Sequence, residues 1–101
     1  MNETQIQELK MKLMPVIKKQ KLQSVKLFGS RARGDNRSDS DYDLYIDAPY
    51  IEDMFELGTL FEELKRALKA DVDIVLKPDI YTRLDDYMLK AIQRDGIAIY
   101  G

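Results

Sequence analysis

The spacing of hydrophobic residues predicts a helix at the start of the chain. Over about 4–20 an apolar position recurs every three or four residues, at Ile6, Leu9, Leu13 and Val16/Ile17. This period is typical of an amphipathic helix. Pro15 falls inside the stretch and removes one backbone donor, so we expect a kink or a break there.

Two further stretches have the helical period. The first spans about 51–69 despite Gly58, and its apolar stripe consists of Met54, Leu57, Phe61, Leu64 and Leu68. The second spans about 79–94 and precedes Gly96 as a C-cap; its inward positions are Ile80, Leu84, Met88 and Ala91/Ile92. Both stripes predict helices that pack on one side.

Four short segments, 25–28, 41–47, 71–76 and 97–100, are typical of strands. In 41–47, alternation places Tyr42, Leu44 and Ile46 on one face and the aspartates on the other. Segment 30–34 can form a helical turn, and 35–40 consists of turn formers. The order α-β-β-α-β-α-β predicts one domain over residues 1–101 of the α/β (α+β) class, in which helices pack on a small mixed β-sheet.

The composition is globular, with 45% hydrophobic and 34% charged residues among 101. No apolar run is long enough for a membrane span, and the first residues, which include Glu3, do not form a signal peptide. We therefore expect a cytoplasmic protein. The net charge of −2 lacks the basic excess of proteins that track nucleic-acid backbones, so direct nucleic-acid binding is disfavoured.

The chain contains no cysteine and no histidine. This excludes a thiolate nucleophile, a cysteine zinc site, a Ser-His triad and an imidazole base. Catalysis would have to rest on carboxylates, metals, hydroxyls, lysines or arginines, and aspartate with magnesium fits that restriction.

Gly29 and Ser30 lie where a predicted strand ends and a helical turn begins. Glycine allows a phosphate to approach the backbone closely, and the amides at a helix start together with a serine hydroxyl can bind its oxygens. The alternative is an ordinary turn with an N-cap, and a lone Gly-Ser pair would favour it.

Asp41 and Asp43 leave the same face of a predicted strand, about 7 Å apart. Two such carboxylates repel each other unless a cation lies between them, so the pair suits a divalent metal. A polar, solvent-facing strand edge is the alternative.

Asp73 lies in an otherwise apolar segment, Val-Asp-Ile-Val, where an unpaired charge is costly. If its strand pairs beside that of Asp41 and Asp43, three carboxylates converge, and two Mg²⁺ ions would be the natural occupants. Asp73 could also take the proton from an attacking hydroxyl. Asp71 shares the face and competes for this role, but its place at the strand start favours a solvated acid.

Three arginines, Arg31, Arg33 and Arg37, flank the proposed phosphate turn. They could neutralise triphosphate charge. Alternatively they balance Asp35, Asp39 and solvent, and for Arg37 we favour this alternative.

These residues give the chain a resemblance to the nucleotidyltransferase superfamily that includes DNA polymerase β and kanamycin nucleotidyltransferase. The shared signature is Gly-Ser, ten residues, then Asp-x-Asp, which stands here as Gly29-Ser30 to Asp41-Tyr42-Asp43. The third acid of the family falls at Asp73. The resemblance covers nearly the whole chain and is greatest to the minimal nucleotidyltransferases (MNT), which consist of the catalytic domain alone.

The resemblance implies a polymerase β-like fold and a reaction. Ser30 and nearby amides would bind the β- and γ-phosphates of ATP, Asp41 and Asp43 would hold two Mg²⁺ ions, and Asp73 would complete one metal site and help activate the acceptor. The product would be an AMP-modified acceptor.

Relatives of this kind commonly act as antitoxins that pair with HEPN-domain ribonuclease toxins and transfer AMP to a toxin tyrosine. The resemblance thus implies a hetero-oligomer in which the partner completes the site, since the second, helical domain of larger relatives is missing. A different hypothesis is a non-catalytic antitoxin that neutralises its partner by occlusion. The intact set of acids favours catalysis, because a pure binder has no physical need for it.

Overall fold

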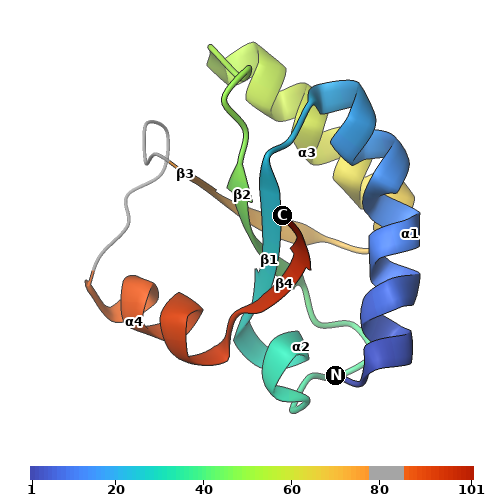
Figure 1. Ribbon diagram of the computed structural model, residues 1–101, viewed down its shortest axis with the longest axis vertical. Helices are drawn as coiled ribbons and strands as arrows, with labels where there is room; N and C mark the ends of the chain where they lie inside the picture. The colour runs from blue at the N-terminus through green and yellow to red at the C-terminus, as the bar shows by residue number, and fades with distance from the viewer. Residues whose placement is uncertain (78–85) are drawn as a thin grey trace.

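The computed structural model describes residues 1–77 and 86–101. Its elements follow one another along the chain (Figure 1) as α1 (Glu3–Gln20), β1 (Ser24–Phe28), α2 (Gly29–Arg33), β2 (Tyr42–Asp47), α3 (Met54–Leu68), β3 (Val72–Lys77), α4 (Asp86–Asp95) and β4 (Ile97–Tyr100). The four strands agree with the predicted segments to within a residue. The predicted order changes at one point, because the helical turn after β1 is a separate short helix, α2.

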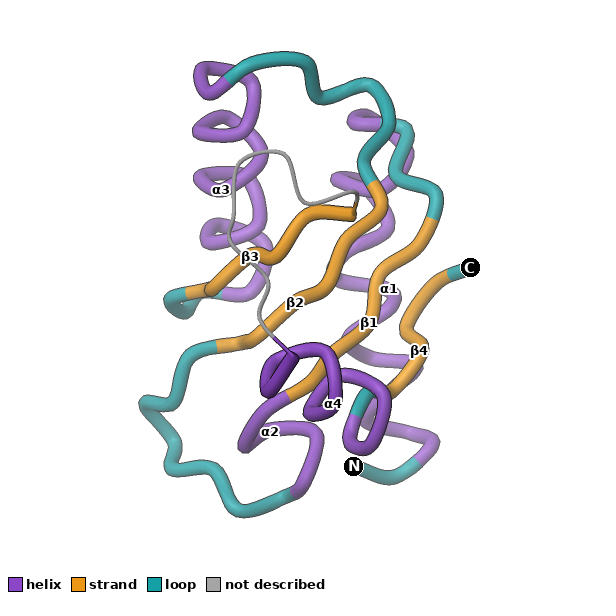
Figure 2. The backbone as a smooth tube through the Cα atoms, turned by 90° about the vertical axis from the view of Figure 1, so that its left-hand side faces the viewer, coloured by secondary structure: helices purple, strands orange, loops and turns teal. Residues whose placement is uncertain are grey.

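The four strands form one mixed sheet in the order β3-β2-β1-β4 (Figure 2). The central strand β1 pairs antiparallel with β2 and with β4, whereas β2 and β3 are parallel. The start of β2 therefore lies beside both the end of β1 and the start of β3. The predicted mixed sheet is confirmed.

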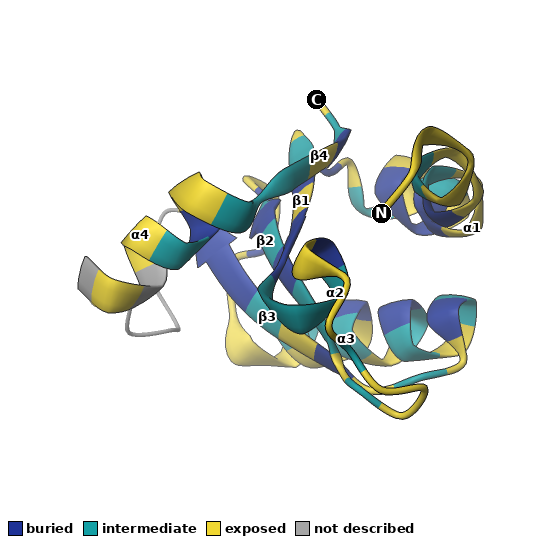
Figure 3. Ribbon diagram, turned by 90° about the horizontal axis from the view of Figure 1, so that it is seen from below, coloured by how far each residue is buried: buried dark blue, intermediate teal, exposed yellow. Residues whose placement is uncertain are grey.

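The core lies on the sheet face covered by α1 and α3 (Figure 3). Alternation along each strand supplies the apolar side chains of this face, and the large side chains that are fully buried are Leu13, Ile17, Leu27, Leu44, Ile46, Leu60 and Leu64. A smaller cluster of Phe28, Val75 and Ile92 lies on the opposite face, under α4. That second face is also the one to which Asp43 and Asp73 point, because each is one residue away from a core-facing position.

Helix α1 begins with a capping box and continues through Pro15. The side chain of Asn2 accepts from the Gln5 amide (2.8 Å), and Gln5 accepts from the Asn2 amide (2.9 Å). Of the kink or break predicted at Pro15, the break is wrong, since the helix extends to Gln20. Burial of Leu13 and its neighbours against the sheet outweighs the one lost backbone hydrogen bond.

Helix α3 begins later than predicted. The Asp53 side chain accepts from the Glu56 amide at 2.8 Å and caps a helix that starts at Met54. Met54 is 61% exposed, and Leu60 is fully buried instead. The assignment of Met54 to the core is therefore wrong, because its position in the first turn of α3 faces solvent.

In the last predicted helix, Ile80, Leu84 and the side chain of Met88 lie outside the described residues. From Asp86 onward the prediction is confirmed, with Ile92 buried. The Gly96 amide donates to the Ile92 carbonyl at 2.8 Å, at the end of α4. Among the described residues, no helix is long and apolar enough to cross a membrane.

Candidate active site

The predicted phosphate turn lies between β1 and α2. Gly29 has a φ of +75° and Gly34 a φ of +85°, and the Gly34 amide donates to the Ser30 carbonyl at 2.9 Å. Both glycines adopt the left-handed conformation that other residues rarely adopt. The sharp turn at Gly29 ends the strand and starts the helix, so that Ser30 lies in the first turn of α2.

Asp43 packs directly against Gly29. A Cβ on Gly29 would overlap Oδ2 of Asp43 and would lie 2.9 Å from its Cγ. Glycine is thus required here for a second reason besides its φ, because the carboxylate needs the space above its Cα. The two halves of the sequence motif, ten residues apart, meet in space.

The strand register brings the third acid to the same place. Phe28 of β1 is the partner of Asp43 in β2, and Asp43 is the parallel partner of Asp73 in β3. Parallel partners point to the same face of a sheet, so the two carboxylates are neighbours. Asp41 precedes β2 and is exposed, and it lies in the loop that leads into the strand of Asp43.

The environment of Asp43 disfavours its charge. Burial, followed by the negative charges of Asp73 and Asp41 and a hydrogen bond with Asp73, raises the pKa of Asp43 to about 6, against the opposing effect of Arg33. Clustered acids of this kind are stabilised by a cation, and carboxylate oxygens are the ligands that Mg²⁺ prefers. The carboxylate donors of Asp43 and Asp73 are therefore of the chemical type that Mg²⁺ takes.

No group of three acids in the described ranges has the arrangement that encloses a metal ion. Asp43 and Asp73 are paired by the register, whereas Asp41 approaches only closely enough to act on the pKa of Asp43. Asp71, the competitor of Asp73, is exposed at the start of β3 and lies 3.8 Å from Lys65 Nζ. This agrees with a solvated strand-start acid. Asp73 is exposed as well, although its strand neighbours are apolar, so the expected cost of an unpaired charge in an apolar segment does not arise. The register with Asp43, and not burial, distinguishes Asp73 from Asp71.

Of the three arginines, Arg33 is the one that acts on the acids. It pairs with Asp35 (3.1 Å) and with Asp95 of α4 (3.4 Å), and its charge lowers the pKa of Asp43. Arg31 is engaged elsewhere, since it donates to the Ser40 carbonyl in the loop before β2. The Arg37 side chain is exposed, and no hydrogen bond or ion pair joins it to another described residue.

Sequence reasoning missed Asp95. It accepts from Arg94 (2.9 Å) and from Arg33, and these hydrogen bonds hold its pKa below the ordinary value. An acid in the last turn of a helix opposes the helix dipole, so its place in α4 indicates that it needs a cationic partner without indicating which one.

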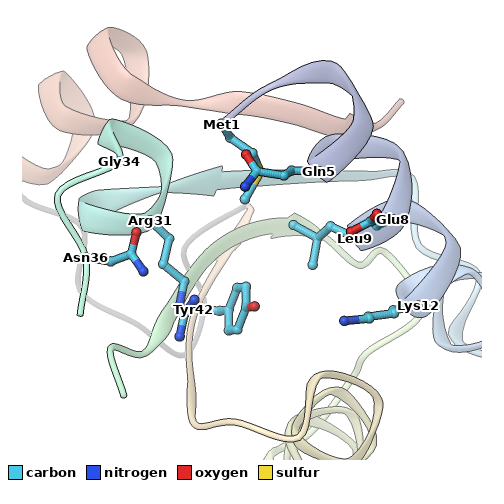
Figure 4. A pocket seen from close by; sticks show the side chains of 9 residues that line it. All are labelled: Met1, Gln5, Glu8, Leu9, Lys12, Arg31, Gly34, Asn36 and Tyr42. Carbon is cyan, nitrogen blue, oxygen red and sulfur yellow. The ribbon is translucent and has the colours of Figure 1, made fainter. Parts of the chain in front are cut away.

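A cavity of about 430 Å³ lies between α1 and the α2–β2 loop (Figure 4). Its walls include Leu9, Lys12, Arg31, Asn36 and Tyr42. Since Tyr42 faces the core side of β2, this cavity is separated by the strand from Asp43 and Asp73, which do not line it.

The family model described as "Polymerase beta, Nucleotidyltransferase" matches residues 11–101. The chain belongs to this family of nucleotidyltransferases. A relative from Methanocaldococcus jannaschii, provisionally named a protein adenylyltransferase, is 32% identical over 99 residues, which cover 95% of this chain and 96% of the relative.

Solved structures agree with this membership. A crystal structure described as a toxin–antitoxin with AMP-PNP matches with a TM-score of 0.73 and 26% identity, over 91% of this chain and 73% of that one. A second, described as a tri-AMPylated Shewanella oneidensis HEPN toxin in complex with MNT antitoxin, matches with a TM-score of 0.67 and 23% identity, over 95% of this chain and 72% of that one. The second likeness concerns the fold, which is that of a minimal nucleotidyltransferase.

Proposed function

We propose that residues 1–101 form one Mg²⁺-dependent catalytic domain that transfers AMP from ATP to a hydroxyl of a protein acceptor. The observation that carries the proposal is the meeting of the Gly29–Ser30 turn with Asp43 and Asp73 at one end of the sheet. A turn with free amides suits phosphate, and acids beside it suit a divalent cation.

Each site residue has a distinct role in this reaction. Asp41, Asp43 and Asp73 would hold Mg²⁺, which when bound supplies charge stabilisation for the phosphates. Ser30 and the amides of α2 bind the β- and γ-phosphates, and Arg33 exchanges Asp35 or Asp95 for a phosphate oxygen.

The bond changes balance with one nucleotide and one acceptor. The acceptor oxygen forms a bond to the α-phosphorus, and the bond from that phosphorus to the oxygen bridging the β-phosphate breaks. Asp73 takes the hydroxyl proton, and pyrophosphate leaves.

The acceptor is proposed to be a tyrosine of a HEPN toxin, with which the chain forms a hetero-oligomer as its antitoxin. Two observations support this. The chain resembles minimal nucleotidyltransferases, and structures of related fold are described as toxin–antitoxin assemblies, one with AMP-PNP and one with an AMPylated HEPN toxin. A reaction that consumes ATP suits the cytoplasm.

The test mixes the purified chain with the protein encoded next to it, α-³²P-labelled ATP and Mg²⁺. We expect label on the neighbour, with none when Asp43→Ala replaces the wild type or when EDTA is present. If wild type and Asp43→Ala leave the neighbour equally unlabelled, the chain is not an AMP transferase for that protein.

A further inference from the structure

Arg31 joins the helix of the phosphate turn to the loop that carries Asp41. Its Nε and Nη2 atoms donate to the Ser40 carbonyl at 2.9 and 2.6 Å, and Nη2 also donates to the Ser38 carbonyl at 3.3 Å. A guanidinium has a rigid fork of five N–H donors. The guanidinium thus makes three hydrogen bonds to carbonyls of the loop residues Ser38 and Ser40, which precede Asp41.

The same guanidinium lies against the residue that follows Asp41. Its central carbon is 4.0 Å from the centroid of the Tyr42 ring (Figure 4), in the range of a cation–π contact. Tyr42 is itself fixed, because its ring packs against the core and its amide donates to the Asp71 carbonyl at 3.0 Å. Arg31 therefore holds both chain neighbours of Asp41.

Asp41 has little else to fix it. It is exposed and lies one residue before β2, outside the strand pairing that orders Asp43 and Asp73. On the core side, a cavity of about 430 Å³ lies between α1 and the side chains of Arg31, Asn36 and Tyr42 (Figure 4). The loop before β2 is therefore not packed tightly against α1.

We propose that Arg31 is a positioning residue that orders the segment from Ser38 to Tyr42, so that Asp41 is presented to the same metal as Asp43. The inference rests on the proposed function in that Asp41 is taken as a metal ligand. Arg31 acts through the Ser40 carbonyl and the Tyr42 ring, whereas Arg33 acts on the phosphates.

The first test measures how strongly Arg31 orders the backbone around Asp41, and it needs no metal or nucleotide. Amide hydrogen exchange by NMR follows Ser40 and Tyr42, whose amides donate to the carbonyls of Arg37 and Asp71. We expect Arg31→Met to speed exchange at both positions by about tenfold or more, because charged hydrogen bonds to the loop are lost. Amides in the middle of α3 should be unchanged.

The second test measures metal binding by the EPR signal of free Mn²⁺, with an ATP analogue that carries a methylene between its α- and β-phosphates. We expect Arg31→Met to raise the half-saturating Mn²⁺ concentration by about tenfold and Arg31→Lys, which keeps the charge without the fork, by a smaller factor. Arg37→Met is the matched control, since it removes the same charge from the loop that Arg31 contacts, at an exposed side chain, and should bind Mn²⁺ as the wild type does.

The outcomes separate this inference from the proposed function. Wild-type exchange rates in Arg31→Met, or an equal loss of Mn²⁺ binding in Arg37→Met, would overturn the positioning role. A wild type that binds no Mn²⁺–nucleotide would instead contradict the proposed function, and the exchange rates would still decide whether Arg31 orders the loop. If Arg31→Met does not fold, Arg31→Lys takes its place in both measurements.

Discussion

The carboxylate of Asp43 occupies the space that any side chain on Gly29 would need. This relationship links the phosphate turn to the acids more tightly than their separation in the sequence indicates. Gly34 has a left-handed φ alone, whereas Gly29 has a left-handed φ and also the close approach of Asp43. The two reasons for a glycine can therefore be measured separately.

The two glycines should therefore respond differently to alanine. Gly34 has a positive φ and no atom within 4 Å of a built Cβ, so we expect Gly34→Ala to lower the free energy of unfolding by about 1 kcal/mol. Gly29→Ala adds the clash with Asp43, and we expect a loss of about 3 kcal/mol. Urea denaturation of both variants measures the difference.

A double-mutant cycle gives the control. In an Asp43→Ala background the carboxylate is gone and only the Cβ of residue 43 remains close, at 3.3 Å from a built Cβ on Gly29. Gly29→Ala should therefore cost much less in that background than in the wild type. If Gly29→Ala costs as much in that background as in the wild type, the close approach of Asp43 is not the cause.

The raised pKa of Asp43 predicts a pH dependence of stability in the metal-free protein. Its pKa is 3.8 in an ordinary carboxyl and about 6 here, so the folded state binds the proton more tightly than the unfolded chain. This contribution to stability is complete below pH 3.8 and is lost as the pH rises through about 6. Because Asp43 is half-exposed, we expect about 1–2 kcal/mol after solvent screening.

The measurement is urea denaturation in EDTA at pH 4 and pH 7.5, for the wild type and Asp43→Asn. From pH 4 to pH 7.5, the free energy of unfolding of Asp43→Asn should rise relative to that of the wild type by about 1–2 kcal/mol. Mg²⁺ in place of EDTA should reduce this difference between the two proteins at pH 7.5. A difference that is the same at both values would show that Asp43 titrates normally.

Arg33 and Arg94 offer a matched pair for the phosphate role. Both donate to Asp95, but only Arg33 acts on the pKa of Asp43. We expect Arg33→Gln to raise the Kd for Mg²⁺–ATP by about tenfold, whereas Arg94→Gln leaves it unchanged. Isothermal titration of both variants makes the comparison, and equal Kd values would remove Arg33 from the site.

Gly58 serves as a test of local helix energetics away from the acids. It lies inside α3, is exposed, and has no atom within 4 Å of a built Cβ. Because its φ is not left-handed, Gly58→Ala should raise the free energy of unfolding by about 0.5–1 kcal/mol. A loss of stability in urea would indicate that the helix bends or packs differently at this position.

The elements that could be predicted from the sequence are those with a local signal. The period of two in 41–47 and the period of three to four before Gln20 depend only on which face is buried, and the structure confirms both. The prediction for Met54 is wrong because a first-turn position can face solvent. The predicted break at Pro15 is wrong because packing outweighs one lost hydrogen bond.

In the candidate site, too, the features with a local signal could be predicted and the long-range contacts could not. The residue types of Gly29, Asp43 and Asp73 indicate their chemistry, but their meeting depends on which strands pair and in which direction. The partners of Arg31 and of Arg33 also depend on long-range placement, since the loop before β2 and the end of α4 approach α2 only in the folded chain. No local pattern specifies those contacts.

The most direct test of the central claim compares Asp73→Asn with Asp71→Asn in the AMP-transfer assay. Asp71 directly precedes β3 and Asp73 is its second residue, and each variant loses the same charge, but only Asp73 is the register partner of Asp43. We predict that Asp71→Asn labels the partner at nearly the wild-type rate and that Asp73→Asn lowers the rate by about a hundredfold or more. Equal rates for the two variants would contradict an active site built on Asp43 and Asp73.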